Sequence, residues 1–176
     1  MKIALRVVFF AVIAGLTFWL YTILFPSPEK VIRKQLLDTA RAASFVANEG
    51  ELARAGNLAG FAGCFADPVE LKINVLGGQR ETQLGRDELV QLGNEARNQL
   101  GSLKVQFLDI TVIVAPDQEH ADADLTVRAS TPGDANYLVQ EMKFTLRKIN
   151  GHWLISRVET IKVLNQAPPL SPPNAA

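Results

Sequence analysis

Residues 7–25 form an unbroken run without a charged side chain, VVFFAVIAGLTFWLYTILF, and this run constrains the chain more than any other feature. As an α-helix, the run would span about 28 Å, which is close to the thickness of the hydrocarbon core of a bilayer. Trp19 and Tyr21 lie toward one end of it, where their rings favour the headgroup boundary. We therefore predict that residues 1–25 form a transmembrane anchor with one membrane-spanning helix.

A cleaved signal peptide is the alternative for this segment. Signal peptides have a shorter apolar core and a cleavage site made of small residues, whereas here the long core runs directly into Pro26-Ser27-Pro28. Lys2 and Arg6 favour a cytoplasmic amino terminus, although three bases also lie just beyond the run: Lys30, Arg33 and Lys34. We expect a single-pass protein of the inner (cytoplasmic) membrane, with its soluble domain on the periplasmic side.

Charge and cysteine content exclude several kinds of protein. The 18 Lys and Arg residues equal the 18 Asp and Glu residues in number, whereas a nucleic-acid-binding protein needs a concentrated basic surface. A single cysteine, Cys64, excludes an internal disulfide and a cysteine-based zinc site. The chain also lacks the glycine-rich phosphate-binding motifs and the His-Glu-x-x-His zinc motif. We expect no nucleic acid, no metal and no cofactor.

After the apolar run, the first part of the remaining chain has apolar residues at the spacing of an α-helix. This spacing predicts a helix over residues 29–48 and a shorter second helix that carries Leu58 and Phe61 and is closed by Asp67-Pro68. The period then changes to two over residues 69–75, which is typical of a half-buried strand. A short strand over residues 80–84 can return from a turn at Gly77-Gly78.

A third helix and three long strands complete the pattern. The helix begins after Gly85, with an apolar stripe of Leu89, Leu92, Ala96 and Leu100. Residues 103–115 are almost continuously apolar, which favours a central strand. Residues 121–129 alternate, and residues 138–149 lead through Asn150-Gly151, a strong hairpin signal, into residues 152–164. The proline-rich residues 165–176 are expected to be an extended, disordered tail.

This order of elements predicts an α+β domain over residues 26–164, preceded by the transmembrane helix. Helices that precede and interrupt a set of antiparallel strands pack on one face of a curved sheet. A curved antiparallel sheet packed on three helices forms a cone with an apolar interior.

Three stretches of the sequence resemble one superfamily in this same order. They are residues 56–68, which end in Ala66-Asp67-Pro68, residues 85–89, which read Gly-Arg-Asp-Glu-Leu, and residues 144–153, which end in Gly151-His152-Trp153. Together they resemble the nuclear transport factor 2-like (NTF2-like, cystatin-like) superfamily, which includes the SnoaL-like polyketide cyclases and the ketosteroid isomerases. An anchor joined to such a domain is also similar to the VirB8-like assembly components of secretion systems.

Catalytic members of this superfamily place an acidic residue or a His-Asp pair inside the cone, so the resemblance implies a search for such a base. Asp109 is the candidate, because it interrupts the apolar strand. The alternative is that Asp109 is an outward-facing or bulge residue. Asp122 and Asp124 share one strand face and are expected to face solvent, and His120 and His152 lie at hairpin ends.

Four aromatic residues are candidates for the lining of a ligand pocket: Phe107, Tyr137, Phe144 and Trp153. The alternative for all four is core packing. On the outer face of the sheet, alternating charges such as Glu141, Lys143 and Arg147 are expected to form cross-strand ion pairs. The resemblance implies a different use for that face, namely a homodimer interface.

The sequence therefore favours a membrane-anchored, non-catalytic binding or assembly module. Its expected partners are the bilayer, through residues 7–25, and a small apolar ligand or another protein. The two alternatives are an isomerase or cyclase of the ketosteroid-isomerase type that uses Asp109, and a structural subunit of a membrane complex.

Overall fold

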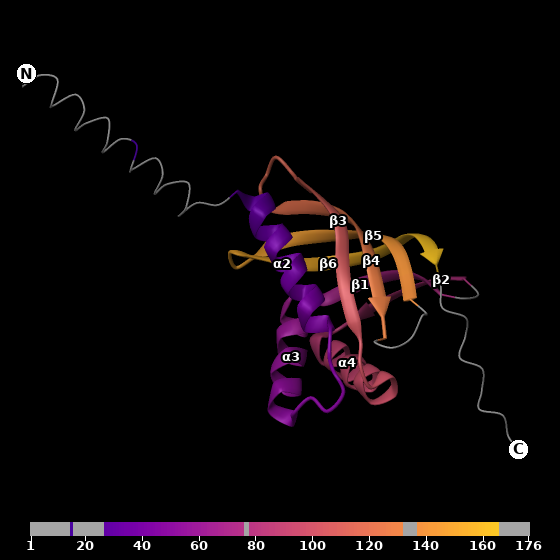
Figure 1. Cartoon of the computed structure of the whole chain (residues 1–176). Helices are drawn as coiled ribbons and strands as arrows, with labels where there is room; N and C mark the ends of the chain where they lie inside the picture. The colour runs from indigo at the N-terminus through magenta and orange to yellow at the C-terminus, as the bar shows by residue number, and fades with distance from the viewer. Residues whose placement is uncertain (1–14, 16–26, 76–77, 132–136, 166–176) are drawn as a thin grey trace, which may run out of the picture.

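The computed structural model describes residues 15, 27–75, 78–131 and 137–165 (Figure 1). Named helices and strands within these ranges succeed one another along the chain in the order α2 (Pro28–Ala43), α3 (Glu51–Gly63), β1 (Phe65–Val75), β2 (Gly78–Leu84), α4 (Arg86–Leu100), β3 (Lys104–Val114), β4 (His120–Ser130), β5 (Tyr137–Ile149) and β6 (His152–Asn165). The predicted α+β architecture with three helices and a curved sheet is confirmed.

The six strands form one sheet in the order β2-β1-β6-β5-β4-β3. Four of the neighbouring pairs are antiparallel, but β1 and β6 run parallel, so the expectation of a purely antiparallel sheet was wrong. The prediction that β3 is central was also wrong, because it is an edge strand. The apolar sequence of β3 therefore does not reflect burial on both faces. One face of the strand packs under α2, while Leu108 and Ile113 on the other face remain exposed.

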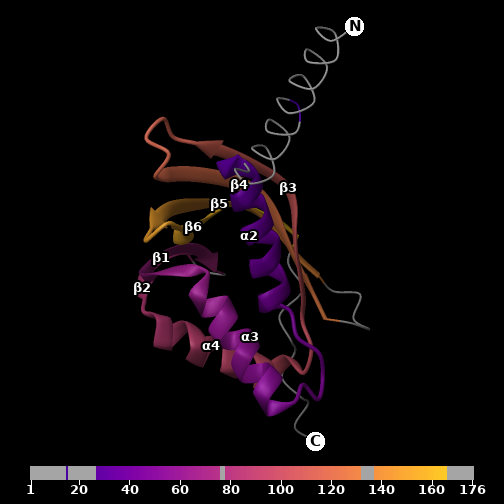
Figure 2. The same ribbon diagram turned by 90° about the vertical axis from the view of Figure 1, so that its left-hand side faces the viewer.

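The three helices lie on one face of the sheet, which we call the inner face (Figures 1 and 2). Side chains from this face and from the helices form a single apolar core, whose fully buried members include Ile32 and Leu36 of α2, Val69 of β1, Leu146 of β5 and Ile155 of β6. The opposite, outer face has no helix over it in the described part of the chain.

Helix α2 ends earlier than its pattern predicts. The Ser44 hydroxyl donates to the carbonyl of Ala40 and accepts a hydrogen bond from the N–H of Val105 at 2.9 Å. Phe45 then pairs with Leu103 beside the edge strand. These contacts draw the chain out of the helix at Ala43 and fix α2 to the start of β3.

Helix α3 and strand β1 also meet at an unexpected point. The helix ends at Gly63, not at Asp67-Pro68, and residues 65–68 already belong to β1. The N–H of Ile155 donates to the Cys64 carbonyl, and Phe65 pairs with Ile155. Pairing with β6 therefore begins the strand before its alternating pattern starts.

Two patterns predicted local structure correctly and one did not. The alternation of β4 is confirmed, since Ala121, Ala123 and Leu125 are buried. Asn150 and Gly151 both have positive φ angles in the hairpin that joins β5 to β6. In α4, however, Leu92 and Leu100 are exposed, because the helix turns Leu89 and Gly93 toward its neighbours.

The predicted anchor and tail lie outside the described residues, apart from Gly15 and Asn165. Among the residues that are described, no helix combines the length and the apolar character needed to cross a bilayer.

Candidate functional site

The interior between the sheet and the helices is filled by apolar side chains. In the described part of the chain, the buried polar or charged residues are two threonines, Thr39 and Thr160. Thr39 donates its hydroxyl hydrogen to the carbonyl of Gln35 at 2.9 Å. The Thr160 hydroxyl is buried and has no hydrogen-bond partner among the described residues. The interior thus holds apolar side chains and one hydroxyl without a partner, and no described acid or base is fully buried there.

Asp109, the predicted candidate base, lies outside this interior. It is exposed and occupies a β-bulge in β3, where the register with β4 shifts between Leu108 and Thr111. Its φ angle is 51°, in the left-handed region, which Asp tolerates better than most residues. The position matches the alternative interpretation of Asp109 as a bulge residue and does not bring its carboxylate to the core.

The four aromatic candidates do not line one common pocket. Phe107 and Phe144 make an edge-to-face contact with ring centroids 5.5 Å apart, within the core. Trp153 is also in the core, and its carbonyl accepts a hydrogen bond from the side chain of Gln35. Tyr137 is 38% exposed and carries Arg128 over its ring, 4.9 Å from the centroid. Phe107, Phe144 and Trp153 thus pack in the core, although Phe107 and Trp153 each also line a separate hollow, and Tyr137 is a surface residue.

A cleft of about 590 Å³ opens near the β5–β6 hairpin, and it contains the most varied chemistry among the described residues. Its lining includes Cys64, Asp67, Arg86, His152 and Trp153. Burial raises the pKa of the Cys64 thiol above its ordinary value, against a smaller lowering by a hydrogen bond with Thr39. The thiol therefore stays protonated and is a poor nucleophile at neutral pH.

Cys64, Arg86 and His152 line this cleft together, although no local pattern in the sequence marks them as neighbours. Asp67 accepts a hydrogen bond from the N–H of Arg86 at 3.3 Å, which fixes the start of α4 against β1. Two residues nineteen positions apart in the sequence meet in this way. The resemblance of residues 56–68 and 85–89 to one family was the only sequence signal for their proximity.

A second hollow, of about 260 Å³, lies where the α2–α3 connection meets α4. Here the Arg97 side chain is 6% exposed and the Glu49 side chain is 12% exposed, and Arg97 Nε lies 3.2 Å from a Glu49 carboxylate oxygen. Arg97 also donates to the carbonyls of Gly93 and Ala42, and its guanidinium lies 4.7 Å from the centroid of the Phe45 ring. All three guanidinium nitrogens of Arg97 thus have partners in the protein. Arg97 therefore has a structural role, in which it connects α4 to the end of α2 and to the α2–α3 connection.

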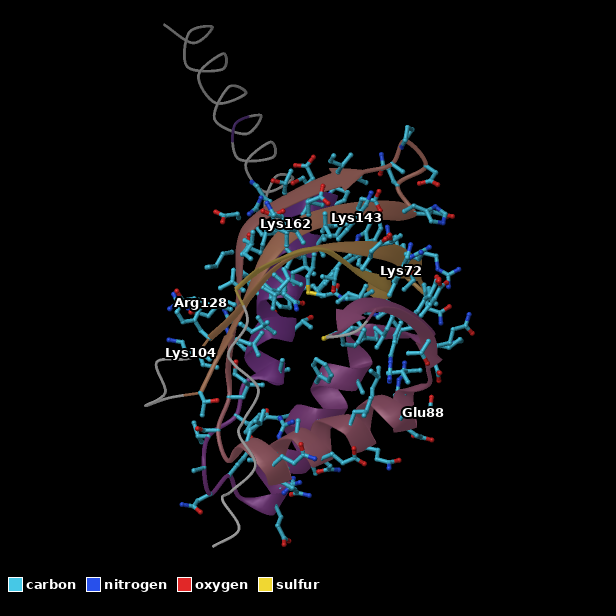
Figure 3. All side chains as sticks on the ribbon, turned by 90° about the vertical axis from the view of Figure 1, so that its right-hand side faces the viewer. Lys72, Glu88, Lys104, Arg128, Lys143 and Lys162 are labelled. Carbon is cyan, nitrogen blue, oxygen red and sulfur yellow. The ribbon has the colours of Figure 1, made fainter. Side chains whose placement is uncertain are left out.

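The outer face of the sheet carries cross-strand ion pairs, but of the three residues named for them only Lys143 takes part; among the described residues, Glu141 and Arg147 form none. Lys143 of β5 lies 2.9 Å from Asp122 of β4, and Lys72 of β1 lies 3.1 Å from Glu159 of β6. Lys143 and Glu159 are register partners, so alternating charges cross four strands. Figure 3 labels the two lysines of this set, Lys143 and Lys72. The hydrogen bond and charge of Asp122 raise the pKa of Lys143. We call these four residues, Asp122, Lys143, Glu159 and Lys72, the charge ladder.

The remaining polar candidates lie at the surface. Asp124 is exposed, and His120 is bonded to Asp117 with an Nδ1–Oδ2 distance of 2.7 Å. The N–H of Glu119 and the His120 ring lower the pKa of Asp117. Within the described residues, no three side chains of His, Cys, Asp or Glu are placed to hold a metal ion.

No known protein-family model matches the sequence, and a comparison with curated proteins also gives no match. Solved structures do match. An NTF2-like protein of unknown function from Pseudomonas putida is similar with a TM-score of 0.59 and 16% identity, over 82% of this chain and 99% of that one. An NTF2-like protein with a cystatin-like fold from Novosphingobium aromaticivorans has a TM-score of 0.58 and 16% identity, over 84% and 87% of the two chains.

A putative scytalone dehydratase from Novosphingobium aromaticivorans is similar as well, with a TM-score of 0.55 and 14% identity over 84% of this chain and 93% of that one. Identities this low carry information about the fold and not about the reaction. The described domain therefore has the cystatin-like, NTF2-like α+β fold.

Proposed function

We propose that this protein is a membrane-tethered, non-catalytic binding or assembly module. The observation that carries the proposal is the chemistry of its interior, where the buried polar residues of the described chain are two threonines. Acid–base catalysis needs a titratable group held close to the substrate, and Asp109 is exposed on a bulge. The isomerase or cyclase alternative would need a base from outside the described interior.

The uncharged run of residues 7–25 supports the tether. Its length suits a single membrane-spanning helix, and only Pro26 and Ser27 separate it from the start of α2. The domain would consequently sit close to the bilayer, on the periplasmic side of the inner membrane in the orientation that we favour. Tethering raises the local concentration of a module for partners in the same membrane.

Two surfaces are available to a binding module of this kind. The cleft near the β5–β6 hairpin has room for a small ligand, with Trp153 and Ile149 as apolar walls. The outer face of the sheet is free for another protein or for a second copy in a homodimer. A role as a structural subunit of a membrane complex would use the same outer face.

Alkaline carbonate extraction of membranes tests the tether. We expect the full chain to stay in the membrane pellet, and the double variant Gly15→Arg, Leu16→Arg to be released. Each Arg near the centre of a spanning helix costs about 2.5–3.5 kcal/mol of insertion free energy.

Leu52→Arg is the matched control, since Leu52 is 89% exposed on α3 and its variant should remain in the pellet. Release of the unmodified chain by carbonate would contradict the proposal.

A further inference from the structure

The start of α2 and the tips of two hairpins lie at the same end of the domain (Figures 1 and 2). Gln35, in the first half of α2, is bonded to the carbonyl of Trp153 beside the β5–β6 hairpin. Ser44, just after α2, is bonded to Val105 at the opposite end of the sheet. The helix therefore begins at the hairpin end. We call this end the proximal end; it comprises residues 28–35, 115–120 and 147–154.

The proximal end has an excess of positive charge. Its five Lys and Arg side chains are exposed, and none of them belongs to an ion pair of the described chain; they are Lys30, Arg33, Lys34, Arg147 and Lys148.

The acids of the proximal end are fewer, and one of them is already bonded. They are Glu29, Asp117 and Glu119, and the carboxylate of Asp117 accepts hydrogen bonds from the N–H groups of Glu119 and His120. The rest of the described domain has the opposite balance, with eleven bases and fourteen acids. The domain is therefore electrically asymmetric, positive at the proximal end and negative elsewhere.

In the tethered protein, the proximal end is also the end nearest the bilayer. Phe25 ends the apolar run, and the three residue steps from Phe25 to Pro28 cover at most about 10 Å. Lys34 lies six helical residues further on, a rise of about 9 Å. The bases of α2 are thus held within about 20 Å of the end of the run. Anionic headgroups attract Lys and Arg side chains that come within about a Debye length, which is about 10 Å at 0.1 M salt.

We propose that the proximal end binds to anionic phospholipid headgroups, with the bases of α2 and of the β5–β6 hairpin toward the bilayer. The inference rests on the proposed tether and adds an orientation to it, because a tether alone leaves the domain free to turn. The acidic remainder of the domain then points away from the headgroups. Six residues of the cleft lining belong to the proximal end, so a domain bound in this way holds the cleft close to the bilayer surface.

Energy transfer in the reconstituted full chain tests the proposal. In a Cys64→Ser background, a donor dye is attached at His152→Cys in the proximal end or at Leu52→Cys. Leu52 is 89% exposed near the start of α3, which lies away from the start of α2 in both views (Figures 1 and 2). The vesicles carry a headgroup-linked acceptor dye and consist of phosphatidylcholine, with or without about 30% of the anionic phosphatidylglycerol.

We expect transfer from position 152 to rise about twofold when phosphatidylglycerol is included, because anionic headgroups attract the nearby bases. The rise should disappear at about 1 M salt, where the Debye length is about 3 Å. Transfer from position 52 should not rise. Equal transfer from position 152 in the two lipid mixtures would overturn the proposal.

A pair of charge variants identifies the surface that binds. Arg147→Gln with Lys148→Gln should remove at least about half of the rise at position 152, because two of the five bases are lost. Lys104→Gln with Lys162→Gln is the matched control, since both lysines are exposed, lie outside the proximal end and belong to no ion pair of the described chain. Equal losses in the two double variants would overturn the proposal.

Flotation of the vesicles in about 1 M salt separates this inference from the tether on which it rests. A chain that floats with both lipid mixtures but shows no rise in transfer has a tether and no headgroup contact. A chain that floats with neither mixture has no tether, and the headgroup contact is then overturned together with it.

Discussion

Arg97 shows how a single side chain can hold three parts of the fold together. From α4 it reaches Glu49 in the α2–α3 connection, the carbonyl of Ala42 at the end of α2 and the ring of Phe45. Both charged side chains are almost fully withdrawn from water. Removing one member of a buried pair leaves the other charge without compensation.

Arg97→Ala should therefore lower the free energy of unfolding by about 3–5 kcal/mol, as measured by urea denaturation. The matched control is Arg41→Ala, which breaks a pair with Asp38 whose side chains are 77% and 44% exposed. An exposed pair of this kind contributes at most about 1 kcal/mol. Similar losses of unfolding free energy in the two variants would show that Arg97 does not connect these parts of the fold.

At the scale of elements, the contact between α3 and α4 depends on a glycine. A Cβ atom on Gly93 would come within 2.5 Å of a δ-carbon of Leu58, which is buried at the α3–α4 interface. Glycine in a helix costs about 1 kcal/mol relative to alanine. The close approach of the two helices explains why the helix keeps it.

Gly93→Ala should lower the melting temperature, because overpacking against Leu58 costs about 1–3 kcal/mol and outweighs the gain in helix propensity. Gly60→Ala in α3 is the control, since nothing lies within 4 Å of its added Cβ. That variant should be more stable by about 0.5–1 kcal/mol. A rise in melting temperature of equal size in both variants would contradict the packing argument.

The elements themselves could be predicted from periodicity, because helices and strands repeat locally, as β4 and the Asn150-Gly151 hairpin show. The position of each strand within the sheet could not be predicted from periodicity. An apolar run such as β3 has the same sequence whether a strand or a helix covers it, and here α2 covers one face at the sheet edge. The parallel pairing of β1 with β6 is likewise a long-range contact without a local signal.

The site was less predictable than the fold for the same reason. Asp109 could be singled out as a break in an apolar strand, but the bulge that turns it outward depends on the register with β4. The joint of Arg97 and Glu49 links residues 48 positions apart. Tyr137 was grouped with three core aromatics as a candidate for a pocket lining, because no local signal shows that this first residue of β5 is at the surface.

At the scale of the whole molecule, the proposed tether raises the question of the compartment in which the domain would meet a partner. Lys2 and Arg6 precede the apolar run, and a short basic head favours export of the domain on the far side of the run. The bases Lys30, Arg33 and Lys34 lie beyond the run and favour the opposite orientation.

Protease treatment distinguishes the two orientations. In cells whose outer barrier is permeabilised and whose inner membrane is intact, we expect the domain of residues 27–165 to be digested. A cytoplasmic protein in the same sample serves as the control and should survive. Digestion of the domain only after the inner membrane is breached would show the opposite orientation.

Helix α2 crosses the sheet diagonally, and this has a mechanical consequence. Gln35 is bonded to the carbonyl of Trp153 at the start of β6, and Ser44 is bonded to Val105 at the start of β3. A force that pulls on the chain ahead of Ser27 along the helix axis would therefore act on both attachments at once, in shear. The domain should unfold under such a force only when the Gln35 and Ser44 hydrogen bonds break together. The amino-terminal end of the domain is therefore suited to resist mechanical force.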